Sequence, residues 1–394
     1  MKRSQFDLLL RGGTHFVLFN TFTGRGAPLD LAGVAHVSRT PPERLDAASV
    51  RQLREVGSLL DDEVDESARL QQCLRERAAA ERVADVTYVL GARGDESESP
   101  GWRQALDLVA ELWREGQVDL VKLRLCPAAC SPVAARVALL NAARARLHPA
   151  GVRLVTMWMG RRLAEATAVR GDEADAFFFR WVLTRQTTAE RHWRRALSAV
   201  AELVAAGHPV ALQLALGEPA NVEGWREALG WAARQPALRS EGCQWDVAPA
   251  RRDALFFLPA ACHERDEPTR ARLADAREAL ARLGLGVRAA VSPGHLHVAC
   301  LGQRPRAWLF DRHGARDWCD QPVSAAPLAA DECLACAHAP FCLGGCPGRP
   351  DYGRHSPGCP GKQEAIRREL QRLAATGQLT LVSRAAGAAP EDDR

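Results

Sequence analysis

Long apolar runs and lysines are both scarce in this 394-residue sequence. No run approaches the roughly 18 apolar residues of a membrane-spanning helix. The apolar stretch in the amino-terminal MKRSQFDLLLRGG is too short for a signal peptide. The sequence contains three lysines and 49 arginines, and its net charge is only +4. We attribute this excess of arginine to genomic base composition more than to nucleic-acid binding. We therefore expect a cytoplasmic protein that binds neither membranes nor nucleic acid.

Common nucleotide and hydrolase motifs are absent as well. The sequence contains no Walker loop, G-x-G-x-x-G, H-E-x-x-H or G-x-S-x-G pattern, which leaves the usual nucleotide, zinc-protease and hydrolase functions without support. Its apolar fraction of 47% and charged fraction of 25% are typical of a globular chain, and the length predicts two or three domains.

From residue 84 onward the pattern alternates between strands and amphipathic helices. Five or six β-α units in series predict a parallel sheet with helices outside it, open or closed as a barrel. The expected strands are residues 84–90, 119–125, 152–158, 176–183, 209–216 and the short run 253–258, and the expected helices are 102–115, 133–147, 189–206, 222–234 and 269–283.

The two ends of the chain follow other patterns. Phe6–Leu10 and His15–Asn20 predict a β-hairpin, followed by helices over 49–60 and 67–83. Residues 291–361 are rich in Gly, Pro, Cys and His, so we expect inorganic cross-links to replace an apolar core there. A final helix over 362–375 and a weak strand over 380–383 precede a polar tail.

The spacing of the cysteines is the most specific feature. Cytoplasmic cysteines more often bind metals than form disulfides. Seven thiolates exceed the four ligands of one tetrahedral zinc, so two centres, or one cluster with spare thiols, are indicated. The series runs Cys300, thirteen residues, Gly314-x4-Cys319, then Cys333-x2-Cys336-x5-Cys342-x3-Cys346, then twelve residues to Cys359.

This series, with its core Phe341-Cys-Leu-Gly-Gly-Cys-Pro347, resembles the seven-cysteine signature of the SPASM domain, a carboxyl-terminal extension of radical S-adenosylmethionine (SAM) enzymes that modify peptides and proteins. The resemblance implies two auxiliary 4Fe-4S clusters. It assigns Cys300, Cys319 and Cys346 to the first cluster, which keeps one open iron. It assigns the second cluster to four further residues, Cys333, Cys336, Cys342 and Cys359.

The β-α units likewise resemble the partial (β/α)6 barrel of radical SAM enzymes, and the run from Phe16 to Gly24 resembles segments ahead of that barrel. The family holds its SAM-cleaving cluster on C-x3-C-x2-C after the first strand. Here Gly91 to Pro100 contains no cysteine. The Gly-Gly-Glu-Pro-like motif expected after the second strand is also missing, and Cys126-Pro-Ala-Ala-Cys130 takes its place. We therefore expect no ordinary SAM binding or cleavage.

Two alternatives remain open for the metal chemistry. Cys126 and Cys130 have the first spacing of the radical SAM motif and could join a third thiolate from Cys243 or Cys262 in an unusual catalytic cluster. Alternatively, zinc could stabilise a binding module without redox chemistry, with His338 or His355 completing a site. We expect His295, His297 and His313 to be surface or hydrogen-bonding residues more than ligands, although any of them could cap the open iron. Cys73 is interpreted as a packing residue and Gly217-Glu218-Pro219 as a turn.

The resulting prediction is a degenerate radical SAM-like protein with an intact SPASM domain. We expect an amino-terminal hairpin and helical region over 1–83 with possible peptide recognition, a partial barrel over 84–290, the SPASM domain over 291–384 and a disordered tail over 385–394. Its expected role is accessory: to bind a peptide or protein substrate, or a complete maturase partner, and to hold clusters of redox or structural use.

Overall fold

The computed structural model describes residues 1–12, 14–80, 82–91, 96–127, 132–183, 190–216, 223–249, 267–286, 306–316, 331–342 and 359–382. They form two compact units. The first unit contains the described residues of 1–78 and 331–382, and the second those of 79–286 and 306–316. The amino-terminal region thus shares a unit with the described residues of 331–382 in the expected cysteine-rich domain, because helices from both pack on one sheet. Residues 306–316 of that expected domain belong instead to the second unit.

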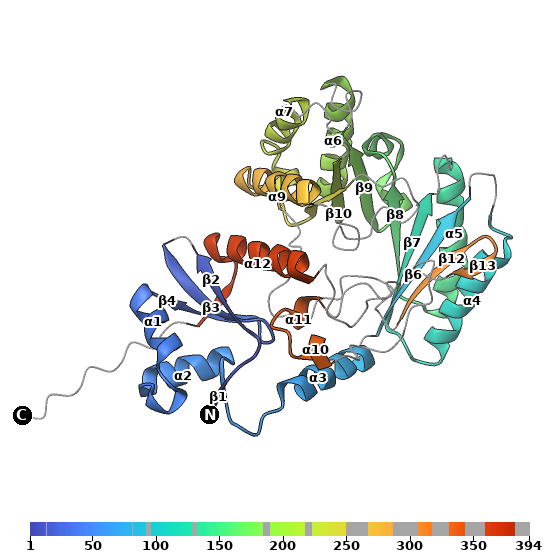
Figure 1. The fold of residues 1–394 in the computed structure, drawn as a ribbon. Coiled ribbons are helices and arrows are strands. Elements are labelled where there is room, and N and C mark those ends of the chain that lie inside the picture. Colours follow the sequence, from blue (N-terminus) through green and yellow to red (C-terminus); the bar gives the residue numbers. More distant parts are fainter. Residues whose placement is uncertain are drawn as a thin grey trace, which may run out of the picture. The chain divides into compact units, whose positions relative to one another are not determined.

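The second unit is built on a large parallel sheet, which makes the chain a mixed α/β protein as expected (Figure 1). Six strands follow one another in chain order across the sheet, and β12 (Ala307–Asp311) extends it in parallel beside β6, with β13 (Gly314–Arg316) antiparallel outside. The six are β6 (Val83–Leu90), β7 (Leu120–Pro127), β8 (Leu154–Gly160), β9 (Ala176–Val182), β10 (Val210–Leu216) and β11 (Cys243–Pro249).

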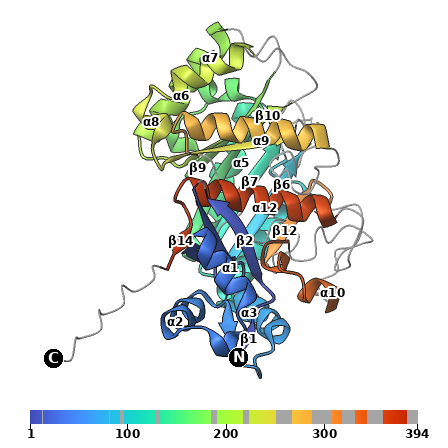
Figure 2. The same ribbon diagram turned by 60° about the vertical axis from the view of Figure 1, so that its left-hand side comes forward.

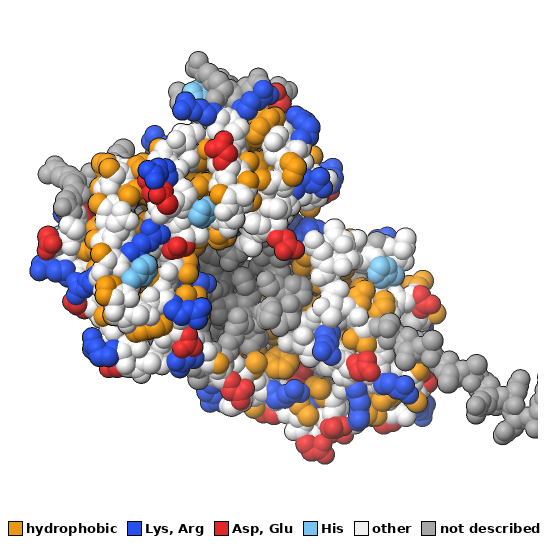
Figure 3. All heavy atoms as spheres, turned by 180° about the vertical axis from the view of Figure 1, so that it is seen from behind, with side chains coloured by type: hydrophobic (Ala, Val, Ile, Leu, Met, Phe, Trp, Pro, Cys, Tyr) orange, Lys and Arg blue, Asp and Glu red, His pale blue; other side chains and the backbone are white. Residues whose placement is uncertain are grey.

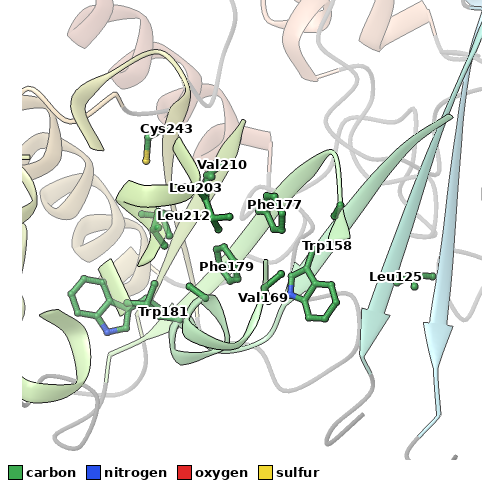
Figure 4. Close-up of a cluster of buried hydrophobic side chains, with 14 of the residues drawn as sticks. Leu125, Trp158, Val169, Phe177, Phe179, Trp181, Leu203, Val210, Leu212 and Cys243 are labelled. Carbon is green, nitrogen blue, oxygen red and sulfur yellow. The ribbon is translucent and has the colours of Figure 1, made fainter. Parts of the chain in front are cut away.

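Helices cover one face of this sheet, because alternate residues of every strand are large and apolar on that side. Phe177, Phe179 and Trp181 of β9 belong to this buried core with Trp158 of β8 (Figure 4). The helices are α4 (Pro100–Arg114), α5 (Val133–Leu147), α6 (Glu190–Ala205), α7 (Glu223–Ala232), α8 (Pro236–Arg239) and α9 (Glu267–Arg282), with 3-10 turns at His148–Ala150, Leu163–Ala168 and Gly171–Glu173.

The sixth strand is not where the sequence pattern placed it. The structure forms β11 from Cys243–Pro249, whereas the expected strand at 253–258 lies outside the described residues. The run was missed because Gln244 and Asp246 interrupt its apolar residues; both alternate with core residues and face the other side of the sheet. There, Asp246 accepts a hydrogen bond from Gln213 at 3.3 Å.

The strand pair β12 and β13 lies against α4, the helix after the first strand. An added Cβ on Gly101 of α4 would lie 1.7 Å from the carbonyl oxygen of Asp311, so only glycine permits this approach. Gly314, at the end of the two-residue turn between the strands, has φ of 140°, a conformation that glycine adopts without strain.

The first unit is built on a four-stranded sheet of order β2-β3-β4-β14. The predicted hairpin is confirmed: β2 (Asp7–Gly12) and β3 (His15–Asn20) pair antiparallel, and β4 (Arg25–Leu29) adds an antiparallel strand that the sequence pattern did not indicate. On the far edge lies β14 (Thr380–Leu381), parallel to β4 (Figure 2). A separate antiparallel pair joins β1 (Lys2–Arg3) to β5 (Leu59–Leu60).

One face of this small sheet is covered by α12 (Cys359–Ala375), which begins three residues earlier than predicted. Its Leu370 and Leu373 pack against Leu10 and Phe19 of the sheet in a buried cluster. The other helices of the unit are α1 (Leu31–Arg39), α2 (Ala47–Val56), α3 (Glu66–Ala80), α10 (Asp331–Leu334) and α11 (Ala339–Cys342), with a 3-10 turn at Pro42–Arg44.

The described surface is mixed in character. On the face drawn in Figure 3, basic and acidic side chains are interspersed, with hydrophobic atoms between them. Among the helices of the described chain, none combines the length and the apolar composition needed to span a bilayer.

Candidate metal centre

Four of the seven predicted cluster cysteines lie on short elements of the first unit. Cys333 is in α10, Cys336 follows it, Cys342 ends α11, and Cys359 begins α12. The other three, Cys300, Cys319 and Cys346, lie outside the described residues, as do Cys130, Cys262, His295, His297 and His355. Only the proposed second auxiliary site can therefore be followed in the structure.

Backbone hydrogen bonds wind the segment around Cys333, Cys336 and Cys342 into consecutive tight turns. The N–H of Cys336 donates to the carbonyl of Cys333 at 3.2 Å, and the N–H of Ala339 donates to the carbonyl of Cys336 at 2.9 Å. The N–H of Cys342 donates to the carbonyl of His338, also at 2.9 Å. These turns hold three thiols, with two and then five residues between them, on one short stretch of chain.

The start of α12 lies next to this turn segment. The side-chain amide of Gln363 donates to Sγ of Cys336 at 3.5 Å, within the range for a sulfur acceptor. Gln363 is four residues after Cys359, so both occupy one face of the helix. A helix N-terminus favours a thiolate because its free N–H groups and dipole are positive.

The inner side of the cysteine segment is apolar. Cys333, 7% exposed, is buried with Phe6 and Leu70, and Cys336 packs against the same cluster. Cys73 of α3 packs there as well, although its distance in sequence gave no sign of this. Cys73 is a packing residue, as expected, but the sequence did not predict that it packs beside Cys333.

His338 is a buried polar side chain between Cys336 and Cys342 in the sequence. It is 8% exposed, and its Nε2 has no hydrogen-bond partner among the described residues. Burial lowers the pKa of His338 to about 4, and the charge of Arg367 acts in the same direction. The imidazole is therefore neutral at pH 7, the form that binds metals.

The thiols fit iron or zinc by chemistry, since both metals take thiolate ligands. The four described thiols do not, however, form a closed ligand set. Within the described ranges, no three His, Cys, Asp or Glu side chains are grouped closely enough to hold a metal ion. The structure thus brings the elements that carry Cys333, Cys336, Cys342 and Cys359 into one unit without assembling a finished set of ligands from described residues.

A carboxylate in the connection between β6 and α4 binds residues at the end of β6 and just after it. Glu96, 4% exposed, accepts a hydrogen bond from the N–H of Gly91 at 2.5 Å and from the hydroxyl of Tyr88 at 2.9 Å. That hydroxyl also lies 2.7 Å from Oγ of Ser99, which caps α4 by accepting from the N–H of Trp102. Burial raises the pKa of Tyr88, so the phenol stays protonated and can donate.

Cys126 and Cys243 lie on opposite faces of the parallel sheet. Cys126 ends β7 and is fully buried against Met159 and Phe178, whereas Cys243 of β11 is buried in the core beneath the helices. Desolvation raises the pKa of each thiol to about 12. Because adjacent side chains of a strand alternate between faces, Cys243 cannot supply a third ligand beside Cys126. That part of the alternative cluster hypothesis is wrong.

Sequence reasoning missed Glu96, Gln363 and the location of Cys73. Glu96 lies in a run of acidic and small polar residues, Gly91 to Pro100, whose pattern is that of a solvated loop. Gln363 was placed on a predicted helix, and its spacing of four from Cys359 is a signal that was available. Contact between Cys73 and the cysteine segment depends on tertiary packing alone.

Comparisons with known proteins leave the family open. No protein-family model and no curated protein matches the chain. Among solved structures, it is similar to a truncated form of 3-deoxy-D-arabino-heptulosonate 7-phosphate synthase from Thermotoga maritima, with 11% identity and a TM-score of 0.27, over 76% of this chain and 90% of that chain. A similarity of this extent carries no conclusion about fold or activity.

Proposed function

We propose that this chain is an iron–sulfur-binding protein with a SPASM-like cysteine domain and a degenerate radical SAM-like barrel, acting as an accessory component in the modification of a peptide or protein. It binds that substrate, or a complete maturase, and holds two auxiliary 4Fe-4S clusters. SAM is not a cofactor in this proposal, and the protein acts in the cytoplasm.

The contrast between two places in the chain carries the proposal. The loop where radical SAM enzymes hold the SAM cluster has a buried carboxylate, Glu96, which is engaged by Gly91 and Tyr88. The cysteine series is complete in the sequence, and four of its members lie on adjoining elements of the first unit. The complete cysteine series, together with a carboxylate and no cysteine after the first parallel strand, supports cluster binding without SAM cleavage.

The residues of the second site have separable roles under this proposal. Cys333, Cys336, Cys342 and Cys359 hold the cluster, which supplies one-electron redox chemistry or a cross-link when bound. Gln363 donates to the sulfur of Cys336 and so helps to orient it. The buried cluster of Phe6, Leu70 and Leu334 keeps water from one side of the site.

Iron and sulfide analysis tests the proposal. Protein purified or reconstituted without oxygen should be brown and contain about eight irons per chain. Cys342→Ser should lower this to about four, because it removes one ligand of the second site. Cys73→Ser is the matched control: it changes a thiol that packs against the apolar cluster of Cys333 but is outside the seven-cysteine series, and it should keep the full iron content.

Colourless protein with stoichiometric zinc would instead establish the zinc-stabilised binding module. Formation of 5′-deoxyadenosine from SAM, abolished by Cys126→Ala, would establish the catalytic alternative that uses Cys126 and Cys130. Either result would overturn the accessory role without SAM.

A further inference from the structure

The free edge of β4 is covered by a carboxyl-terminal piece of the same chain. On one side β4 pairs with β3, and on the other Thr380 lies opposite Arg25 and Leu381 opposite Gly26 in a parallel pairing. The N–H of Val382 donates to the carbonyl of Gly26 at 2.8 Å. Residues 380–382 are thus an extended peptide added to the edge of a sheet.

One residue of α2 and one residue of β4 accommodate such a strand. Gln52 of α2 is 6% exposed, and its side-chain amide donates to the carbonyl of Val382 at 3.1 Å. Gly26 leaves room for the apolar side chain above it: an added Cβ would lie 3.2 Å from Cδ2 of Leu381 and 2.6 Å from Cγ1 of Val17. A buried amide that binds a backbone carbonyl, and a glycine under an apolar side chain, make a slot for extended chain.

The strand that fills the slot is held weakly. It is two residues long, Thr380 is exposed and Leu381 is 40% exposed. Pro28 lies two residues after Gly26, so its backbone faces the same edge of β4. Because proline has no N–H, the pairing with the carboxyl-terminal strand cannot extend past this point along β4. The segment stays in place because Leu379 is buried and the N–H of Gln378 donates to the carbonyl of Leu373, which tethers it beside the edge.

We propose that the slot between β4 and α2 binds an extended segment of a peptide partner by strand addition, and that residues 380–382 occupy it until the partner displaces them. The slot recognises one backbone N–H and one backbone C=O of the peptide, and one apolar side chain of the peptide that lies over Gly26. The identity of the partner as a modified peptide rests on the proposed function; the slot itself does not. Because the tether gives residues 380–382 a high effective concentration, loosening them strengthens binding of an added peptide.

The full-length Val382→Pro variant tests this displacement, because proline removes the N–H that donates to Gly26. The probe is a fluorescein-labelled synthetic peptide with the sequence of residues 377–386, followed by fluorescence anisotropy on reconstituted protein. We expect it to bind Val382→Pro protein about tenfold or more tightly than the unchanged chain, in line with release of a tethered competitor. The same peptide with proline at the position of Val382 should not bind.

Variants of the slot separate strand addition from other binding. Gln52→Ala, introduced together with Val382→Pro, should weaken the peptide complex at least about fivefold, since the clamp on the carbonyl is lost. Gln72→Ala is the matched control, because Gln72 is exposed on α3 and bonds only Glu76 among described partners. Hydrogen exchange of residues 24–29 should rise in Val382→Pro protein and fall again when the peptide is added.

Three results would overturn the inference. Folded Val382→Pro protein that does not bind the peptide would show that the edge accepts nothing in trans. Equal binding with and without Gln52 would place the peptide elsewhere. A dimer of the unchanged chain that Val382→Pro abolishes would assign the edge to a second copy. Iron content is measured separately, so failure of the iron–sulfur proposal can be distinguished from failure of the strand-addition inference.

Discussion

Asp7 shows how burial changes the chemistry of one residue in the small sheet. Its Oδ1 accepts hydrogen bonds from the amide of Asn20 at 2.9 Å and the hydroxyl of Ser58 at 2.8 Å. Desolvation nevertheless dominates and raises the pKa of Asp7 from 3.8 to about 6, with Glu66 adding to the rise. Between these two values the folded protein holds a proton that the unfolded chain has released. The free energy of unfolding therefore falls as pH rises through that window.

Asp7→Asn should remove this pH dependence while keeping an acceptor oxygen for Asn20 and Ser58. We expect the variant to match the unchanged protein near pH 4 and to exceed its stability by about 1–2 kcal/mol at pH 7. Urea unfolding at both pH values measures the difference. Glu63→Gln is the control, because Glu63 is exposed and its change should have no such effect. An equal shift at both pH values would refute a raised pKa at Asp7.

At the scale of elements, the connection from β6 to α4 depends on Glu96. Its carboxylate satisfies the N–H at the end of the strand, its carbonyl accepts from Ser99, and Ser99 caps the helix. One buried side chain thus joins the last residues of a strand to the first turn of a helix.

Glu96→Ala should destabilise the protein by about 1–3 kcal/mol, because it removes the hydrogen bonds that the buried carboxylate accepts from the N–H of Gly91 and the hydroxyl of Tyr88. Glu98→Ala, two residues away on an exposed position, is the matched control and should change stability little. Chemical denaturation of both variants gives the comparison. Iron content should be the same in both, and a fall in iron with Glu96→Ala would instead connect this loop to a metal site.

Elements with a strong period were predictable from the sequence. The hairpin of β2 and β3 and the helices α4 and α5 lie close to the expected residues, because alternation and helical spacing there are regular. β11 was not found, because polar residues such as Asp246 face the other side of the sheet within a short strand. β4 was not found either, since its run Arg25–Leu29 contains a glycine and a proline, and its pairing with β3 and β14 determines its structure.

At the scale of the whole molecule, the two units should respond differently to metal removal. The second unit has a large apolar core of its own, with residues from every one of the six parallel strands. The described cysteine segment has small clusters instead, such as that of Phe6, Leu70 and Cys333. Under the proposed function, cluster binding therefore supplies a larger share of the folding free energy in the first unit than in the second.

Iron chelation should accordingly reduce hydrogen-exchange protection in residues 331–342 and leave residues 83–90 and 120–127 unchanged. Mass spectrometry of exchange in the reconstituted and iron-depleted protein measures both regions in one experiment. Cys342→Ser should reproduce the effect of depletion without a chelator. Unchanged protection of 331–342 after complete iron loss would mean that the segment folds on side-chain packing alone.

The sequence by itself determined the alternation of strands and helices, the cysteine spacing and the absence of cysteine between Gly91 and Pro100. These are properties of neighbours along the chain, where periodicity and spacing act. Only the tertiary structure decided that Cys73 lies beside Cys333, that Cys126 and Cys243 face opposite sides of a sheet, and that Val382 joins Gly26. Contacts of this kind join residues far apart in sequence, and burial and backbone pairing select them as the chain folds.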